Sequence, residues 1–280
     1  MPAIPRKQRL KVARRALLTA LGLRQDGFFI PFRHASSVPT PPPAYAALEQ
    51  VFRTAEPQMQ QTLDLISQSI SSPDGLLDAC AGPLANHWNG GYFGPLDTAA
   101  AFALARHHQP ARVVEVGSGS STHTITAAIG AEAIQCIDPV PRHSISALGV
   151  RWEEAVLDES HTNLFEALGP GDIAFFDSSH VLFEGTDVDI IQNRILPVLA
   201  KGVIVHIHDI PLPDPYPNAW RLRAYTEQIG LGGWLCGGAY RILFSSHYAA
   251  TRMRDQTVAA LSGLPPHAGP GGGSLWLERV

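Results

Sequence analysis

The sequence predicts an α/β fold in which a mostly parallel sheet is covered by helices on both faces. From residue 112 onward, short apolar strands alternate with helical segments, which is the pattern of a parallel sheet. The glycine turn Gly117-x-Gly119 joins the first of these strands to a helix, and later strands end on acidic or histidine residues. Ligands of such sheets bind beyond the carboxyl ends of the strands, so these features locate a candidate site.

The predicted strands are short and largely apolar, as expected of strands that are buried on both faces. They are Val113–Val116, Ala133–Ile137, Val150–Val156, Ile173–Phe176 and Gly202–Ile207, followed by Tyr240–Phe244 and Ser274–Leu277. Helices are predicted between them, over Ser121–Gly130, Val188–Leu199, Ala219–Leu231 and Ala249–Leu261. Asp187 and Asp189 are expected to begin one of these helices, because acidic side chains favour the positive end of a helix dipole.

The first hundred residues are predicted to be helical and irregular. Six basic residues precede the short apolar stretch Ala16–Leu23, and we expect an uncleaved basic helical arm that packs on the domain, on a partner subunit or on an anionic surface. The proline-rich segment Ser36–Pro43 separates this arm from a helical segment at Tyr45–Ser71, which Pro57 is expected to kink or split. A further helix is predicted at Leu96–His107. We expect an N-terminal arm or lid over residues 1–90 and the main domain over residues 91–280.

Composition limits the classes of function. The 280 residues carry a formal net charge of -4, with a sequence pI of about 6.3, which argues against a general nucleic-acid binder. The three cysteines (Cys80, Cys136 and Cys236) are widely spaced and form no CxxC motif. We therefore expect neither a disulfide framework nor a zinc–thiolate site, and a reducing cytoplasm is the simplest setting. No apolar run reaches the roughly 18–20 residues that cross a bilayer, so stable membrane insertion is not expected.

The glycine turn is compatible with NAD, FAD and S-adenosylmethionine (SAM). Glu115 lies two residues before Gly117, where its carboxylate suits the ammonium group of a methionine moiety and would repel a pyrophosphate. Thr122 occupies the place of the third glycine of the dinucleotide fingerprint. Asp138 ends the next strand, about 20 residues on, where an acid holds ribose hydroxyls in both cofactor classes. The pattern favours SAM, with dinucleotide binding or a turn without a ligand as alternatives.

Acidic and histidine side chains follow two strands that should be neighbours. Asp177 and His180 follow the fourth strand, and His208 and Asp209 end the fifth, so we expect them to converge beside the glycine turn. In one interpretation His208 or His180 is a general base, since imidazole titrates near neutral pH. In a second, Asp177, His208 and Asp209 bind a divalent metal. In a third, these groups only cap strand ends, and His206 is expected to be a core or supporting residue.

Several segments, in their order and spacing, resemble the bacterial class I SAM-dependent methyltransferases grouped as methyltransferase domain 24. They are GYFGPLD at 91–97, VVEVGSGSST at 113–122, DIAFFDSSH at 172–180, ILPVLAKGVIVHIHDIPLPDPYP at 195–217, EQ at 227–228 and SLWLERV at 274–280. The resemblance spans roughly the last two-thirds of the chain. It implies a Rossmann-like fold with a mostly parallel seven-stranded sheet whose last strand is antiparallel, an N-terminal helical extension, and SAM as cofactor.

The resemblance also implies roles for individual residues. Glu115, Gly117, Ser118 and Gly119 are assigned to the methionine end of SAM, Asp138 to the ribose, Asp158 to the region near adenine, and Tyr92 and Phe93 to a cover on the N-terminal side. In metal-dependent O-methyltransferases of the catechol and cephalosporin-methoxylating types, acidic ligands sit at the ends of the same two strands. This sequence departs from them, because His208–Asp209 replaces an acid followed by an asparagine or another acid.

The leading functional hypothesis is methyl transfer from SAM to an oxygen, or a nitrogen, of a small molecule, with or without a divalent metal. Two alternatives stay open: a SAM-binding enzyme that uses the sulfonium for another reaction such as cyclisation, and a non-catalytic scaffold. The prolines of Pro211–Pro217 are expected to form a stiff rim, from which Tyr216, Trp220 and Glu227 are candidates for substrate contact or for ordinary packing. We expect a homo-oligomer.

Overall fold

The computed structural model describes residues 6–39, 41–88, 91–267, 269 and 271–280. Its described strands form one seven-stranded sheet in the order β3-β2-β1-β4-β5-β7-β6. The strands are β1 (Val113–Val116), β2 (Ile134–Ile137), β3 (Arg151–Glu153), β4 (Ile173–Phe176), β5 (Ile204–Ile207), β6 (Tyr240–Ser245) and β7 (Leu275–Arg279). All residues of β1, β4 and β5 are buried, in accord with their largely apolar sequences, and this burial includes Glu115 and His206.

The pairing of the strands confirms the predicted sheet. Strands β1 to β5 pair in parallel, and β7 runs antiparallel to both β5 and β6. This is the mostly parallel, seven-stranded Rossmann-like arrangement with an antiparallel last strand. The third strand is shorter than the predicted Val150–Val156, because it lies exposed at the sheet edge and pairs with β2 alone. Beyond Glu153 the chain leaves the sheet, so that Ala155 and Leu157 line a cavity.

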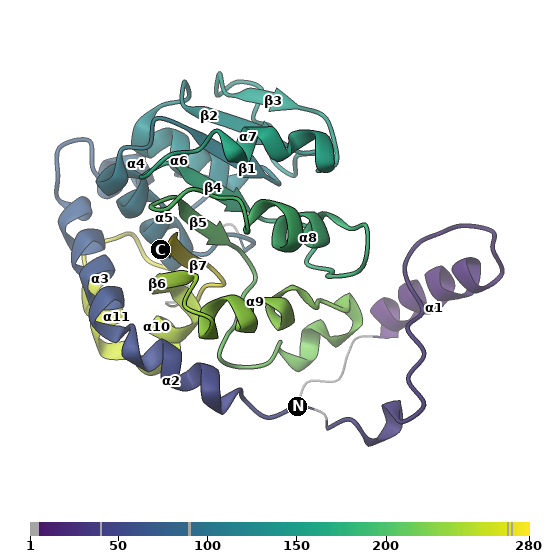
Figure 1. Ribbon diagram of the computed structural model, residues 1–280. Coiled ribbons are helices and arrows are strands. Elements are labelled where there is room, and N and C mark those ends of the chain that lie inside the picture. The colour runs from purple at the N-terminus through teal and green to yellow at the C-terminus, as the bar shows by residue number, and fades with distance from the viewer. Residues whose placement is uncertain (1–5, 40, 89–90, 268, 270) are drawn as a thin grey trace.

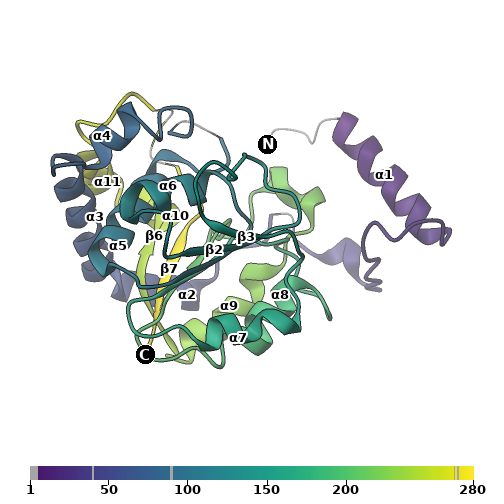
Figure 2. The ribbon, with the colours of Figure 1, turned by 90° about the horizontal axis from the view of Figure 1, so that it is seen from above.

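Helices cover both faces of the sheet. Figure 2 places α3, α5 and α6 on one face and α7, α8 and α9 on the other. The helices before the first strand are α1 (Arg6–Ala20), α2 (Ala46–Thr54), α3 (Glu56–Ile70), α4 (Leu76–Ala81) and α5 (Pro95–His108). The later ones are α6 (Ser120–Ile129), α7 (Thr162–Glu166), α8 (Asp187–Ile190), α9 (Glu227–Cys236), α10 (Ser246–Arg252) and α11 (Arg254–Ala260). No helix among these described residues is both long and apolar enough to span a bilayer.

The helix predicted at Ala219–Leu231 is not continuous. A 3-10 helix, η4 (Asn218–Arg223), ends where Ala224 adopts a left-handed conformation with φ 55, and α9 begins at Glu227. Helical spacing alone could not predict this break, since Ala is a strong helix former. The break lets the backbone amide of Thr226 donate to the carbonyl of His180 (2.9 Å). It therefore brings the start of α9 to the end of β4.

The N-terminal residues divide into two parts. Helices α2 to α4 share one hydrophobic core with the sheet, and α3 packs on both α5 and β6. Helix α1 buries no residue and projects from the body (Figure 1). Pro57 lies in the first turn of α3, so the expected split of the segment Tyr45–Ser71 is confirmed. The predicted boundary between residues 90 and 91 falls beside residues 89–90, which lie outside the described part of the chain, and stays a prediction.

Candidate active site

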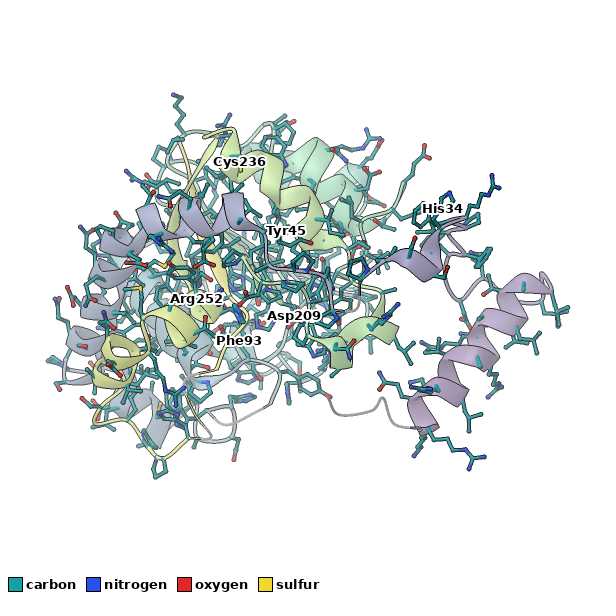
Figure 3. The ribbon with its side chains drawn as sticks, turned by 90° about the horizontal axis from the view of Figure 1, so that it is seen from below. His34, Tyr45, Phe93, Asp209, Cys236 and Arg252 are labelled. Atoms are coloured by element: carbon teal, nitrogen blue, oxygen red, sulfur yellow. The ribbon has the colours of Figure 1, made fainter. Side chains whose placement is uncertain are left out.

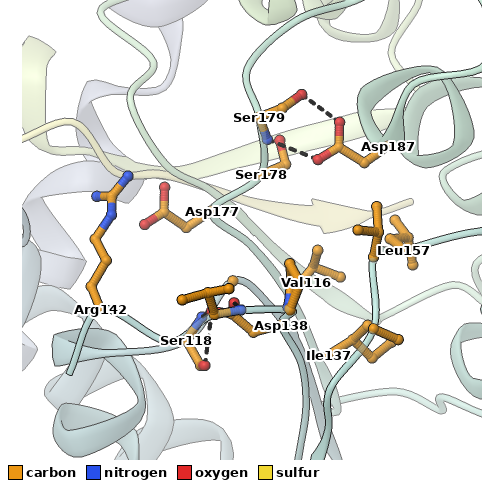
Figure 4. A pocket seen from close by; sticks show the side chains of 15 residues that line it. Val116, Ser118, Ile137, Asp138, Arg142, Leu157, Asp177, Ser178, Ser179 and Asp187 are labelled. Carbon is orange, nitrogen blue, oxygen red and sulfur yellow. Dashed lines mark hydrogen bonds between the residues drawn. The ribbon is translucent and has the colours of Figure 1, made fainter. Parts of the chain in front are cut away.

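A cavity of about 350 Å³ opens at the carboxyl ends of β1, β2 and β4 (Figure 4). The glycine turn contributes Gly117 and Ser118, and the residues directly after β2 and β4 contribute Asp138 and Asp177. The remaining lining residues are Val116, Ile137, Pro139, Val140, Arg142, Ala155, Val156, Leu157, Ser178, Ser179 and Asp187. The volume lies within the range of about 300–1,000 Å³ that small-molecule pockets have. The cavity therefore joins the predicted cofactor turn to the predicted reaction cluster.

Asp138 fixes one wall of this cavity. Its Oδ2 accepts hydrogen bonds from the backbone amide (2.6 Å) and the hydroxyl (3.0 Å) of Ser118, and its Oδ1 accepts one from the amide of Val140 (2.7 Å). The side chain is almost completely buried. A carboxylate has about four acceptor sites, so these bonds leave capacity for a ribose hydroxyl. Asp138 thus lies where the sequence predicts a ribose contact.

Gly117 meets strand β4 at very close range. A Cβ atom at this position would lie 2.0 Å from the carbonyl oxygen of Asp177, and its φ of +76 falls in the left-handed region. No side chain is compatible with that approach, which explains a glycine here. The turn and the end of β4 are therefore in direct backbone contact.

Glu115 does not line the cavity. It lies fully buried behind the glycine turn, where its Oε1 accepts a hydrogen bond from the hydroxyl of Ser121 (2.6 Å) and its Oε2 accepts a longer one from Cys136 Sγ (3.4 Å). Burial raises the pKa of Glu115 to about 7, although the hydrogen bond from Ser121 opposes this rise. In this structure Glu115 ties β1 to the start of α6.

Four other predicted cofactor residues occupy different places. Gly119 is not in the cavity lining and faces His143 instead. Asp158 accepts hydrogen bonds from the amide and hydroxyl of Ser160 at the start of a short helix. Tyr92 is exposed and lies under the guanidinium of the lining residue Arg142, 4.9 Å from its ring centre. Phe93 is buried against His208, with 5.3 Å between ring centres. Only Tyr92 thus reaches the edge of the cavity, through Arg142.

The predicted cluster does assemble, and His180 is at its centre. Its Nε2 lies 3.2 Å from Asp177 Oδ1 and 3.5 Å from Asp209 Oδ2, and its Nδ1 lies 2.8 Å from Glu227 Oε2. The ring is almost fully buried. Burial alone lowers a histidine pKa, but the hydrogen bonds to Asp177 and Glu227 outweigh it and raise the pKa of His180 to about 10. His180 is therefore an imidazolium at neutral pH.

His208 occupies a second buried position between acids. Its Nδ1 lies 3.5 Å from Asp177 Oδ1 and 3.7 Å from Asp209 Oδ1, and its Nε2 lies 3.5 Å from Asp97 Oδ2. Burial opposes its protonation, but the charge of Asp177 and the contacts with Asp177 and Asp97 hold the pKa of His208 well above its usual value. His206 stacks on Phe175 in the core, and burial holds its pKa well below normal, so it has the supporting place that was predicted.

The carboxyl groups of the cluster differ in proton affinity. Burial works against ionisation of Asp177, yet the charge of His208 and the bonds to both imidazoles hold its pKa well below normal. For Asp209 burial dominates and raises the pKa. The side chain of Asp209 is less exposed than that of Asp177 but has the higher proton affinity, and for that reason it suits a proton acceptor better than Asp177 does.

Two residues of the cluster are held in unusual backbone conformations. His180 has φ 61 and Asp209 has φ 55, each just beyond a strand end. A residue other than glycine there costs about 1–3 kcal/mol, and such residues concentrate at functional sites. The two strained residues are also a contact pair, at 3.5 Å. The fold therefore sustains strain at the point where β4 and β5 meet.

The geometry does not favour a metal. Within the part of the chain that the structure describes, no three His, Cys, Asp or Glu side chains form a group that could hold a metal ion. Asp177, His208 and Asp209, the predicted ligands, form ion pairs with one another and with His180 instead. The side chains as placed do not fit a metal.

The site also contains residues that the sequence pattern did not single out. Asp97 near the start of α5 accepts hydrogen bonds from the amides of Gly273 and Ser274, and so holds the segment before β7 against His208. Its position after a proline is typical of a helix start, so nothing indicated a role in the cluster. Arg223 and Tyr225 lie at the rim, near Asp209 and His180 respectively. Figure 3 places Asp209 and Phe93 in the body, away from His34 on the projecting segment.

Comparison with known proteins gives distant structural similarities. No family model matches the sequence, and no curated protein matches it. The MycE methyltransferase of the mycinamycin biosynthetic pathway, solved with Mg, SAH and mycinamycin VI, is similar over 75% of this chain and 55% of its own (15% identity, TM-score 0.42). This chain thus spans about half the length of MycE.

Two further structures are similar over nearly their whole length. A DUF574 family protein from Streptomyces avermitilis matches 78% of this chain and 97% of its own, with 12% identity and a TM-score of 0.41. The plantazolicin methyltransferase BpumL, solved with SAH, matches 82% of this chain and 99% of its own, with 12% identity and a TM-score of 0.37.

Proposed function

We propose that this chain is a class I SAM-dependent methyltransferase that methylates an oxygen atom of a small molecule. The observation that carries the proposal is the cavity lined jointly by Gly117, Ser118, Asp138 and Asp177. In Rossmann-like sheets this edge is the ligand site. Gly117 and Ser118 are proposed to bind the methionine end of SAM, and Asp138 its ribose. Glu115 acts from behind the turn, by holding Ser121.

The remaining cofactor residues have narrower proposed roles. Gly119 gives α6 its start, and Asp158 shapes the chain next to the lining residue Leu157 rather than touching adenine. Tyr92 is proposed to cover the cavity together with Arg142. Phe93 supports the ring of His208. SAM, when bound, would supply an electrophilic methyl group.

The side chains of the cluster then provide positioning and a place for the substrate proton. Asp177 faces the cavity and orients the acceptor hydroxyl. His180 and His208 hold their own protons and fix Asp177 and Asp209 by ion pairing. Asp209 is proposed to receive the substrate proton, because burial has raised its pKa. The histidines are thus positioning residues, whereas the sequence alone suggested a base.

The test is direct. Calorimetric titration should detect SAM binding, and Gly117→Arg should abolish it. Absence of binding at millimolar SAM would contradict the proposal. Product analysis separates methyl transfer, which yields S-adenosylhomocysteine (SAH), from other reactions of the sulfonium, which yield methylthioadenosine. If Asp177→Ala and His208→Ala leave every cellular role unchanged, the scaffold alternative gains instead.

Metal assistance and assembly into a homo-oligomer stay predictions, and each can be tested separately. Activity that survives exhaustive EDTA treatment rejects metal assistance, and activity that is lost with EDTA and restored by Mg²⁺ supports it. Light scattering of the purified full chain tests for a homo-oligomer.

A further inference from the structure

Arg223 lies at the rim of the cluster, in a position that would also suit the cationic group of a ligand. Its guanidinium carbon lies 4.6 Å from the ring centre of Trp220 and 5.5 Å from that of Tyr225. Its Nη1 lies 4.0 Å from Asp209 Oδ2, and 42% of its side chain is exposed. A guanidinium within about 6 Å of an aromatic face is held by the ring quadrupole. The contact is exposed and therefore displaceable.

The aromatic side chains around Arg223 form a defined surface. Tyr216, Trp220 and Tyr225, which we call the aromatic rim, lie with ring centres 5.7–6.1 Å apart. Tyr225 also packs on His180, with 4.5 Å between ring centres. The aromatic rim is thus in contact with the cluster in which His180 pairs with Asp177 and Asp209. A molecule held on the rim has part of its structure at the reaction site.

The charge of the cluster favours a cation at this place. Four carboxyl groups, those of Asp97, Asp177, Asp209 and Glu227, surround only the two imidazoles of His180 and His208. Arg223 supplies one more positive charge from the rim. An aromatic face next to a carboxylate is the combination that recognises an ammonium group. An anionic ligand at Arg223 would instead approach Asp209 and the other carboxyl groups.

We propose that the substrate carries a protonated amine, which displaces Arg223 from the aromatic rim and from Asp209. This inference rests on the proposed function and names the class of its substrate. A protonated amine has no lone pair, so it serves as the anchor, and the methyl acceptor is a hydroxyl elsewhere on the same molecule. Trp220, Tyr225 and the Oδ2 atom of Asp209, near which Arg223 now lies, determine specificity, and Oδ1 of Asp209 is left to receive the hydroxyl proton. Arg223 competes with the substrate.

Three probes with one ring and different charges test the proposal: benzylamine, benzyl alcohol and benzoate. Each is titrated by NMR into the full-length protein with SAH and EDTA present. Benzylamine is expected to bind more tightly than the other two. Arg223→Ala is expected to tighten benzylamine binding about two- to fivefold, which is the size of one exposed cation–π contact. Trp220→Leu is expected to weaken it by a similar factor.

Arg221→Ala is the matched control, since it removes the same charge from the same 3-10 helix and is expected to leave the order of the probes and their affinities unchanged. If benzoate binds best and Arg223→Ala abolishes its binding, Arg223 is an anion anchor and the proposal is overturned. Equal binding of the three probes overturns it as well. SAH binding is measured separately. If SAH does not bind, the methyltransferase proposal is rejected. The order of the three probe affinities reports on the amine site alone.

Discussion

Nδ1 of His180 lies 2.8 Å from Oε2 of Glu227, and both side chains are almost completely buried. The pair joins the loop after β4 to the first residue of α9. Burial raises the pKa of Glu227, while the partner imidazole opposes that rise. The side-chain amide of Gln192 also donates a hydrogen bond to the backbone carbonyl of Glu227 (2.8 Å), so the start of α9 is fixed at two points.

Glu227→Gln should lower the pKa of His180 from about 10. The amide can still accept a hydrogen bond but carries no charge to stabilise the imidazolium, whereas Asp177 stays in place. NMR titration of the imidazole Cε1–H signal measures the change. The exposed Glu159→Gln serves as control, and a His180 pKa that is unaltered in Glu227→Gln would refute the ion pair.

Gly117→Ala should destabilise the fold more than Gly130→Ala does. Both glycines have positive φ (+76 and +84), but an added Cβ meets Asp177 only at position 117, whereas position 130 has no atom within 4 Å. Left-handed strain alone costs about 1–2 kcal/mol, so this is the expected loss for Gly130→Ala. Denaturant unfolding compares the variants. Equal losses would mean that the turn does not contact β4 as described.

The free energy of unfolding of Glu115→Gln, compared with that of the natural protein, should increase as pH rises. The folded pKa of Glu115 is about 7, above its ordinary value of 4.5. The folded state therefore retains a proton that the unfolded chain loses, and stability declines as pH rises from about 4.5 through 7. Glutamine avoids this loss. The full difference is about 3 kcal/mol, since one pKa unit corresponds to about 1.4 kcal/mol. Unfolding of the cofactor-free protein at several pH values measures it, and a difference independent of pH would contradict the buried carboxyl.

Helix α1 should be removed by trypsin before the body is cut. It buries no residue and carries several Arg and Lys side chains, so its local unfolding costs little. The segment after it is held by the stacking of Phe28 on Phe183, with 4.2 Å between ring centres. The trimmed protein should bind SAH with unchanged affinity, because residues 116–187 line the cavity. Mass spectrometry identifies the first cuts, and early cleavage within the sheet region would be incompatible with the structure.

The parallel part of the sheet was predictable because most residues of its central strands are apolar, and largely apolar strands fit a buried parallel sheet. The meeting of Asp177, His180, His208 and Asp209 was predictable for a related reason, since neighbouring parallel strands end at one edge. The protonation state of the histidines in the cluster was not predictable. Burial lowers the pKa of His208 and Asp177 raises it, and Asp97 adds a smaller rise although it is far away in sequence and reaches the cluster only through the packing of α5.

Local sequence also did not predict backbone conformation where tertiary contacts determine it. The left-handed Ala224 interrupts a segment with helical spacing, and the gain is the contact between His180 and Glu227. Glu115 was placed at the ligand by its position before the glycines. Its hydrogen bond with Ser121 holds the side chain behind the turn, and its contact with the methionine ammonium group stays a prediction. The partners of the break at Ala224 lie far apart in the sequence, whereas Ser121 lies within the glycine motif itself.

The close approach of Gly117 to the carbonyl of Asp177 also constrains how such a protein can evolve. Every amino-acid replacement at position 117 collides with the backbone carbonyl of Asp177 at the end of β4, so this position admits no gradual drift. Trp220, Arg223 and Tyr225 are instead partly exposed on a 3-10 helix and the turn after it. Single mutations are therefore tolerated more easily on that side than at the glycine turn.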